Sequence, residues 1–138
     1  MVYAAVMGTA QQGGESVLAM LSGDPNITAD SIDSDLARFA SKLVVEDHGH
    51  PQGPCLTWRA ALRDGKYGNF KAKGVARRAH LWIREHVIGP IEAGMTVDHL
   101  CRNTRCCNPW HGEQVTRREN VLRELAARRE MRAMRMAA

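Results

Sequence analysis

The spacing of apolar residues is most regular between residues 28 and 45, where it has the period of a helix. Acidic side chains crowd into the first half of this stretch, near the end where a helix dipole favours negative charge. The apolar positions are separated by four, three, one and three residues: Ile32, Leu36, Phe39, Ala40 and Leu43. We therefore predict an amphipathic helix over 28–45 that packs on the rest of the domain.

The stretches on either side of this helix have no comparable pattern. Residues 1–27 are rich in small residues, Gly and Gln, with one short apolar run, so we expect a mobile arm or one weak helix. Residues 47–54 read DHGHPQGP, which is typical of a loop. His48 and His50 lie in it, and such a pair in a Pro/Gly loop is more often exposed than a metal ligand. The chain thus divides into an arm (1–27), a helix with its loop (28–54) and a main domain (55–138).

Alternation with a period of two marks a β-hairpin at 56–73. Its strands are 56–62 and 67–73, and the connection contains the Asp64-Gly65 pair, which favours a tight turn. One face points inward: Trp58, Ala60, Leu62, Phe70 and Ala72. The other face is polar and mostly basic: Thr57, Arg59, Arg63, Asn69, Lys71 and Lys73. Such a row on a two-stranded ribbon fits the major groove of DNA, and a merely solvated sheet face would have the same pattern.

Two more helices are predicted in the C-terminal half. Residues 76–87 place Ala79, Trp82, Ile83 and His86 on one side and end at a Gly-Pro pair. A last helix starts near residue 116 or 117, because Thr116 followed three residues later by Glu119 is a capping box. Strands at 95–100 and 113–116 precede it. Together with the last helix they form a predicted ββα core over 95–133.

Length and composition indicate one small domain. An apolar content of 44% permits a modest core, but only three Trp, two Tyr and two Phe are available to fill it, so a bound metal would be a useful staple. No apolar run approaches the roughly 20 residues needed to cross a bilayer, and the start lacks a signal-peptide pattern. We therefore expect a soluble, cytoplasmic protein with no membrane partner.

The chain has a net charge of +4, and its charged residues are distributed unevenly along the sequence. Residues 1–54 carry two basic and seven acidic side chains, whereas residues 55–138 carry 17 basic and eight acidic ones. A basic region beside a metal-binding motif favours a polyanion, and in particular nucleic acid, over a surface that is merely soluble. The acidic first 54 residues could instead bind a partner or mask the basic face.

Thiols and imidazoles gather in the segment 97–120, VDHLCRNTRCCNPWHGEQVTRREN. Cys101, Cys106 and His111 follow C-x4-C-x4-H spacing, and zinc requires four ligands of this kind. Cys55 is the only other thiol apart from Cys107, so it is the predicted fourth ligand and would tie the hairpin to this segment. Cys107, which neighbours a ligand, is expected to face away as a reduced, buried thiol. Disulfides are disfavoured because two of the four cysteines are adjacent and no export signal precedes them.

The same segment contains residues suited to phosphodiester hydrolysis. Asp98 and Asn120 offer hard oxygen ligands for Mg²⁺ or another divalent cation, and His99 is free to act as a base for water. Taken singly, these residues could equally be a surface carboxylate, a satisfied histidine and a helix-surface amide. Their grouping around a zinc motif favours a hydrolytic centre.

The motif resembles the ββα-metal nucleases, and within them the phage-type HNH endonucleases and the related His-Cys box homing endonucleases. Those carry a DHLC-x4-C-x-NP-x-H…EN pattern, which this chain matches from Asp98 through Asn120. The likeness extends upstream, at these positions: Arg38-Phe39 to Val44, Cys55 with Trp58, Tyr67-Gly68-x-Phe70, Ala79-His80 and Gly89-Pro90-Ile91. The resemblance covers residues 36–125.

The resemblance implies an α+β fold with a zinc-stapled ββα-metal core, an additional N-terminal hairpin and flanking helices. It implies His99 as general base, Asp98 and Asn120 as Mg²⁺ ligands, one structural Zn²⁺ on Cys55, Cys101, Cys106 and His111, and Asn108 as the residue that holds the loop in shape. A second zinc site, found in some His-Cys box enzymes, is not expected because no Cys follows Cys107.

The chain departs from the family pattern at Leu56, Ala60, Leu81 and Gly112. Leu81 replaces an arginine, which puts one phosphate contact in doubt. Arg77, Arg78 or Arg105 could supply it, and His80 could face the phosphate or pack in the core.

The sequence therefore predicts a DNA endonuclease of the HNH type that leaves 5′-phosphate and 3′-hydroxyl ends, for homing, phage DNA processing or defence. Its partner would be double-stranded DNA in the cytoplasm of a bacterial host cell, with the gene belonging to the host or to a phage. Double-strand cutting by one such centre needs a second copy, which leaves a homodimer open. The alternative is a zinc-stapled DNA-binding protein that does not cut, whose signature would be the loss of Asp98, His99 or Asn120.

Overall fold

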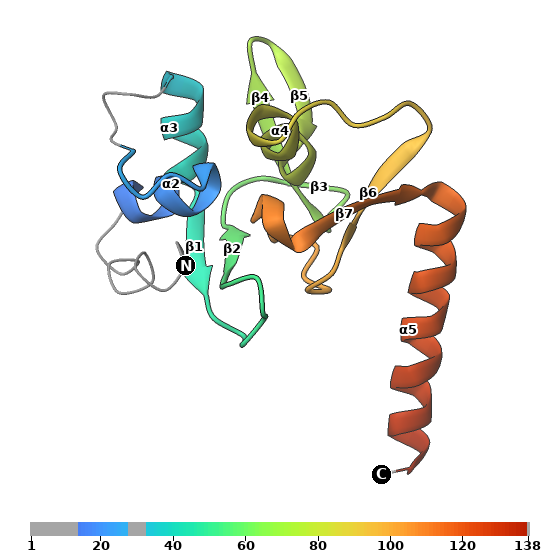
Figure 1. Cartoon of the computed structure of the whole chain (residues 1–138). Helices are drawn as coiled ribbons and strands as arrows, with labels where there is room; N and C mark the ends of the chain where they lie inside the picture. Colours follow the sequence, from blue (N-terminus) through green and yellow to red (C-terminus); the bar gives the residue numbers. More distant parts are fainter. Residues whose placement is uncertain (1–13, 28–32, 138) are drawn as a thin grey trace.

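The computed structural model describes residues 14–27 and 33–137. In these ranges, helices surround three small antiparallel sheets, and the last helix projects from the rest (Figure 1). The predicted α+β class is thus confirmed. None of the described helices combines the length and the apolar character that crossing a membrane requires.

The N-terminal helices pack closely on the domain. Helix α2 (Gly14–Ser22) buries residues 17–21, and Leu21 has no exposed surface. Of the two alternatives, a mobile arm or one weak helix, residues 14–22 form the helix, while residues 1–13 lie outside the described part. Helix α3 (Ser34–Ala40) is capped at its N-terminus by Asp33, whose carboxylate accepts a hydrogen bond from the Leu36 N–H at 2.8 Å.

The helix predicted over 28–45 is wrong beyond Ala40, and residues 28–32 lie outside the described ranges. Strand β1 (Leu43–Glu46) follows instead and pairs antiparallel with β2 (Cys55–Trp58) across the predicted loop. Val44 and Val45 are β-branched and favour a strand once a partner is available. Leu43 fitted the helical spacing because that spacing marks buried residues. It is indeed buried, but as part of strand β1 and not of a helix.

The second sheet replaces the predicted hairpin with a three-stranded meander. Strand β3 (Leu62–Arg63) pairs with β4 (Tyr67–Ala72) around the Asp64-Gly65 turn, and β4 pairs with β5 (Val75–Arg78) around Lys73-Gly74. The predicted first strand, 56–62, is therefore divided between two sheets. The helix predicted over 76–87 starts later, as α4 (Ala79–Val87), because 75–78 complete the sheet.

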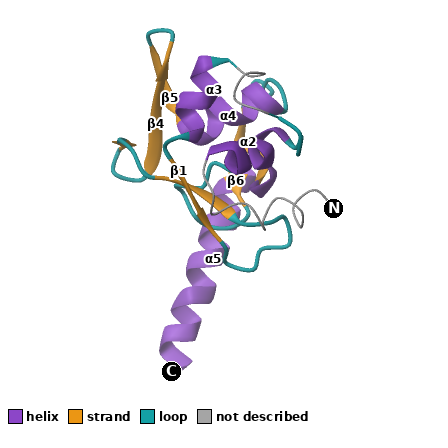
Figure 2. Ribbon diagram, turned by 90° about the vertical axis from the view of Figure 1, so that its left-hand side faces the viewer, coloured by secondary structure: helices purple, strands orange, loops and turns teal. Residues whose placement is uncertain are grey.

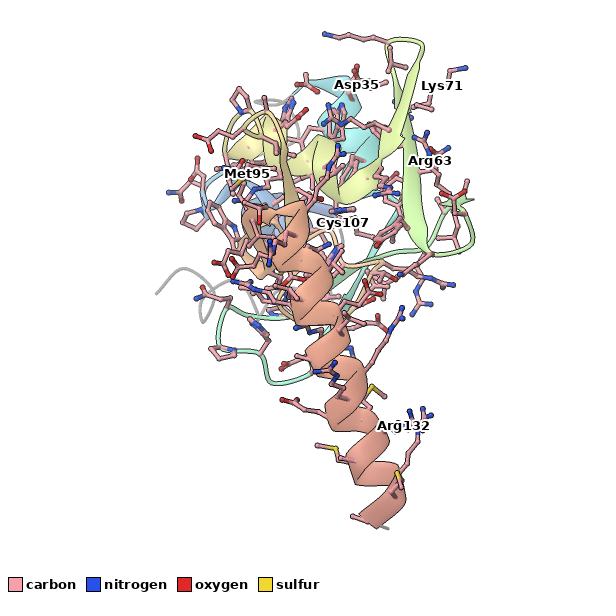
Figure 3. All side chains as sticks on the ribbon, turned by 90° about the vertical axis from the view of Figure 1, so that its right-hand side faces the viewer. Asp35, Arg63, Lys71, Met95, Cys107 and Arg132 are labelled. Carbon is pink, nitrogen blue, oxygen red and sulfur yellow. The ribbon has the colours of Figure 1, made fainter. Side chains whose placement is uncertain are left out.

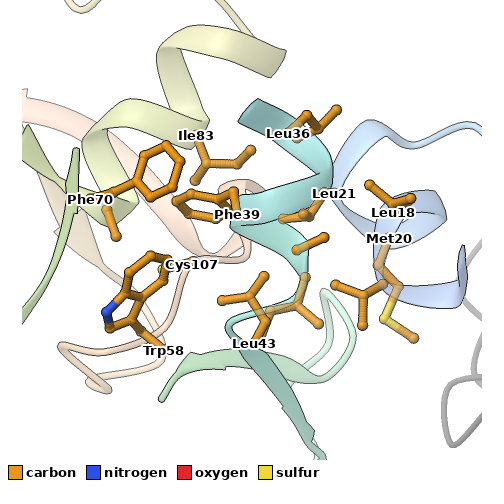
Figure 4. Close-up of a cluster of buried hydrophobic side chains, with 14 of the residues drawn as sticks. Leu18, Met20, Leu21, Leu36, Phe39, Leu43, Trp58, Phe70, Ile83 and Cys107 are labelled. Atoms are coloured by element: carbon orange, nitrogen blue, oxygen red, sulfur yellow. The ribbon is translucent and has the colours of Figure 1, made fainter. Parts of the chain in front are cut away.

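The apolar core lies between α2, α3, α4 and the inner faces of β2 and β4 (Figure 4). Phe39 is at its centre, with ring centroids 5.0 Å from Trp58, 4.9 Å from Phe70 and 5.2 Å from Trp82. Gly68 permits this packing, because a Cβ there would lie 2.6 Å from the Trp58 ring. Trp58, Phe70 and Ala72 face inward as predicted, but Thr57 is buried rather than outward.

The C-terminal part has the predicted ββα order. Strand β6 (Met95–His99) pairs antiparallel with β7 (Gly112–Thr116), and the turn η3 (Pro109–His111) closes the long connection between them. Helix α5 (Arg117–Ala137) contacts both strands with its first turns and then extends away from the domain (Figures 1 and 2). It buries none of its residues.

Candidate metal centre and adjoining pocket

Four side chains from distant parts of the sequence converge beside β2. The ligand atoms of Cys55, Cys101, Cys106 and His111 all lie within 4.8 Å of one another. Cys55 opens β2, Cys101 follows β6, Cys106 forms an isolated bridge to Thr57, and His111 ends η3. The structure thus brings together the four predicted zinc ligands.

The imidazole of His111 is oriented for metal binding. Its Nδ1 is 3.6 Å from the sulfur atoms of both Cys55 and Cys106, while its Nε2–H donates to the Gly53 carbonyl at 2.9 Å. Because that carbonyl can only accept, the proton resides on Nε2 and the Nδ1 lone pair points into the cluster. The His50 ring lies against His111, with centroids 4.2 Å apart.

The thiols also favour a bound cation. Hydrogen bonds from Cys106 and Cys55 hold the pKa of Cys101 far below its usual range, so the cluster stabilises a thiolate. Three sulfurs and one imidazole nitrogen are the donor set of a closed structural zinc site. The residues therefore fit a metal such as zinc.

Cys107 belongs to the apolar core and not to this cluster (Figure 4). It is 2% exposed, and burial raises the pKa of its thiol. Cys107 is therefore an unreactive core residue.

Asn108 makes the contacts expected of a residue that shapes the loop. Its amide donates to the Pro54 carbonyl at 2.9 Å, its Oδ1 accepts from the Trp110 N–H at 3.0 Å, and its own N–H lies 3.4 Å from the Cys106 sulfur. These bonds connect the start of β2 to the metal cluster.

The three predicted catalytic residues share a pocket of about 240 Å³ between β6 and α5. Asp98 and His99 are nearly buried at the end of β6, and Asn120 is half-buried on the first turn of α5. Sequence reasoning missed several of the other side chains around this pocket: Lys66, Tyr67, Arg102, Thr104, Glu124 and Arg128. Glu124 follows Asn120 by four residues, a helical spacing that could have indicated it.

His99 is held in one tautomer. Its Nε2–H donates to the Cys106 carbonyl at 3.2 Å, which leaves the Nδ1 lone pair free as a proton acceptor. Burial lowers the pKa of His99, so the ring stays neutral at neutral pH. Those are the two properties that a general base requires.

Arginine neutralises a pair of like charges beside the pocket. Asp98 and Glu113 face each other in the β6–β7 register, where two carboxylates would repel. Arg123 lies between them, 3.2 Å from Asp98 Oδ2 and 2.9 Å from Glu113 Oε2, and it also binds Glu119 at 3.0 Å. Accordingly the pKa of Arg123 is raised and that of Glu113 is lowered.

The outer face of the meander leads into the pocket. In the observed register Arg63 is opposite Tyr67 and Asn69 is opposite Arg78, so these residues share one face with Lys71. Figure 3 shows Arg63 and Lys71 along this side of the meander. Tyr67 lines the pocket and lies under the Arg78 guanidinium at 4.5 Å. Part of the predicted DNA-contacting row is therefore continuous with the pocket.

The remaining predicted DNA contacts are placed differently. Arg59 pairs with Glu46 at 2.9 Å on the other sheet, Arg77 pairs with Glu85, and Lys73 and Arg105 are exposed on turns. A second groove of about 540 Å³ adjoins Asn120 and gathers Arg77, Arg78 and Arg117. Arg117 was not among the predicted contacts.

His80 packs behind His99 instead of facing the pocket. The two rings are 4.4 Å apart, and both line a cavity of about 10 Å³ that is enclosed partly by Arg84. Burial, together with His99, Arg78 and Arg77, lowers the pKa of His80 to about 2. A neutral, buried ring offers no charge to a phosphate. His80 therefore packs inside the domain, which is one of the two positions that the sequence left open, and does not face the phosphate.

Comparison with known proteins agrees with this geometry. A family model described as HNH endonuclease matches residues 77–122, the segment from the end of β5 to the first turns of α5. Residues 77–122 are therefore similar to an HNH endonuclease domain, which agrees with the resemblance of the sequence to the phage-type HNH endonucleases. No solved structure matches the chain.

Two curated phage proteins are similar over parts of the chain. The "Uncharacterized gene 5.3 protein" of Enterobacteria phage T3 is 36% identical over 44 residues, which is 32% of this chain and 44% of that protein. "Protein 7.7" of Escherichia phage T7 is 32% identical over 66 residues, 48% of this chain and 51% of that protein. The chain thus spans about half the length of the curated relatives it matches.

Proposed function

We propose that this protein is a metal-dependent DNA endonuclease of the HNH type. The observation that carries the proposal is one pocket lined by Asp98, His99 and Asn120, together with the Nε2 hydrogen bond of His99 that leaves its Nδ1 free. The HNH match, which suggests nuclease activity, covers all three residues. A Zn²⁺ ion on Cys55, Cys101, Cys106 and His111 would be structural, because four protein ligands leave no position for substrate.

In this proposal His99 accepts a proton from water at Nδ1, and the resulting hydroxide attacks phosphorus. The bond from phosphorus to the 3′ oxygen breaks, and the departing oxygen takes a proton from water, which leaves a 5′-phosphate and a 3′-hydroxyl. Asp98 and Asn120 would hold Mg²⁺ or a similar cation through their side-chain oxygen atoms, and the cation would supply positive charge to the scissile phosphate and the departing oxygen. The basic face of the meander and the groove with Arg77, Arg78 and Arg117 would hold the flanking DNA backbone.

Supercoiled plasmid incubated with and without Mg²⁺ tests the activity directly. His99→Ala should abolish cleavage while metal content and DNA binding stay as in the parent. The ring bonds to the backbone carbonyl of Cys106 and not to its sulfur, and it forms no ion pair with the described residues. Arg135→Met, on the far end of α5, is the matched control and should cut normally. Cleavage by the His99 variant at the parental rate would show that another group is the base.

A non-cleaving DNA-binding protein is the alternative. It predicts that the parent shifts DNA in a gel but leaves the plasmid supercoiled with any divalent cation. The proportion of nicked and linear plasmid would also separate single-strand from double-strand cutting, and sedimentation of the protein alone and with DNA would show whether a homodimer forms.

A further inference from the structure

The two carboxylate oxygens of Asp98 are held with unequal firmness. Oδ2 is bound by Arg123, whose guanidinium is fixed in turn by Glu113 and Glu119. Oδ1 is 3.5 Å from Nη1 of Arg102, at the outer limit of a hydrogen bond. One oxygen therefore has a rigid partner and the other has a loose one.

Arg102 is poorly tethered for a residue so close to a buried carboxylate. Its side chain is 52% exposed, compared with 6% for Asp98, and among the described residues Asp98 is its only ion-pair partner. Arg128, which lines the same pocket, is paired with Glu124 at 2.8 Å instead. Arg102 can thus leave its partner without breaking any other ion pair.

The backbone aims this side chain at the pocket. Arg102 has a φ of 60°, in the left-handed region that residues other than glycine seldom adopt, and its N–H donates to the His99 carbonyl at 3.1 Å. The turn lies between the metal ligand Cys101 and the rest of the loop. The bound metal cluster would therefore hold the unusual conformation and, with it, the direction of the guanidinium.

We propose that Arg102 is a phosphate ligand that Asp98 retains until a divalent cation binds. The inference rests on the proposed nuclease function. When Oδ1 binds the cation, Arg102 loses its partner and is repelled by like charge, and its side chain already lines the same pocket as His99 and Asn120. Phosphate oxygens match the fork of an arginine and provide its new partner. Arg123 stays on Oδ2 and is a positioning residue for Asp98.

Binding measurements test this coupling without relying on cleavage. In a His99→Ala background, the affinity for a short DNA duplex is measured with Mg²⁺ and in buffer without added Mg²⁺. Mg²⁺ should strengthen DNA binding by the parent background. Adding Arg102→Met should lower the affinity in Mg²⁺ about tenfold, the loss of one charge-assisted hydrogen bond, and leave the affinity without Mg²⁺ unchanged.

Three further variants sharpen the result. Arg102→Lys keeps the charge and should recover most of the affinity, and Arg135→Met should change nothing. Asp98→Asn weakens the hold on Arg102, so DNA binding without Mg²⁺ should strengthen. Mn²⁺ binding in the absence of DNA should be at least as tight in Arg102→Met as in the parent background, because a competitor for Oδ1 is gone. Equal zinc content in all variants verifies that the loop beside Cys101 is intact.

The proposal is overturned if Arg102→Met lowers DNA affinity equally with and without Mg²⁺, or lowers it in neither. It is also overturned if Mg²⁺ does not strengthen DNA binding by the parent background, or if Arg102→Met weakens Mn²⁺ binding. Failure of the proposed function has a different signature: the chain with intact His99 does not cut plasmid, whatever Arg102 does in the binding experiment.

Discussion

The N-terminal and C-terminal halves of this domain are stabilised by different interactions. Helices α2, α3 and α4 enclose aromatic and aliphatic side chains together with β2 and β4 (Figure 4). Strands β6 and β7 bury Val97 and Val115 outside that core, and α5 buries nothing. The half that carries the pocket is therefore the half with little apolar burial.

Directional contacts take the place of a core in the C-terminal half. Arg84 donates to the Pro109 and Gly112 carbonyls at 3.3 and 3.1 Å, and the Trp110 indole donates to the Met20 carbonyl at 3.2 Å. The metal cluster and the Arg123 network add to these. Gly112 permits the close approach of Val97 and Arg84, since a Cβ there would lie 2.7 Å from Val97 Cγ1 and 3.3 Å from Arg84 Nη1. Such contacts fix side chains in position, which a catalytic pocket needs more than it needs burial.

The largest effect should come from removing a metal ligand. Cys106→Ser should abolish the proposed zinc binding and the ordered structure of β6, β7 and the connection between them, because structural zinc sites supply on the order of 10 kcal/mol to folding. Metal content by mass spectrometry and hydrogen exchange of residues 95–116 measure this. Cys107→Ala is the control: it should keep its metal and lose only about 1 kcal/mol. If the Cys106 variant kept its metal and its protection from hydrogen exchange, the C-terminal half would not depend on the metal cluster for its stability.

A core substitution should act on the other half. Phe39→Ala removes a fully buried ring that contacts three aromatic neighbours, and the free energy of unfolding should fall by about 3–5 kcal/mol. Thermal unfolding with zinc present measures it. The variant should still bind its metal below the transition, while Val75→Ala, at a site 66% exposed, should stay within about 0.5 kcal/mol of the parent. Metal loss on Phe39→Ala would mean that the halves fold as one unit.

The smallest effect is the pH dependence of the free energy of unfolding that comes from His80. This residue of α4 packs against His99 of β6, where the two halves meet. The folded-state pKa of His80 is about 2 and the unfolded value is 6.5, so protonation favours the unfolded chain. The stability that neutral His80 provides is complete above pH 6.5 and declines as pH falls below it, by at most about 1.4 kcal/mol per pH unit.

Unfolding of the parent and of His80→Gln between pH 7.5 and 5 isolates this contribution, because acid release of the metal is common to both proteins. The glutamine variant should show the shallower decline of stability with falling pH. Parallel pH profiles would mean that solvent reaches His80 in the folded protein.

Short-range sequence patterns account for much of the fold. The Asp64-Gly65 turn, the ββα order, the helix predicted over 76–87 apart from its first three residues, and the inward face of β4 could all be predicted, because each depends on neighbours within a few residues. The failures share a cause. Residues 43–46 become a strand only because β2 pairs with them, and residues 75–78 join β4, so tertiary pairing overrode the local pattern in both cases.

The sequence by itself determined which chemistry is present: three thiols and an imidazole for a metal, and a carboxylate, an imidazole and an amide for a pocket. Only the tertiary structure decided how those groups are tuned. The Cys106 carbonyl selects the tautomer of His99, His80 is buried behind it, and two arginines of unequal rigidity share the oxygens of Asp98. These relations join residues whose separation in sequence does not indicate their distance in space, because packing brings them together and desolvation sets their charge.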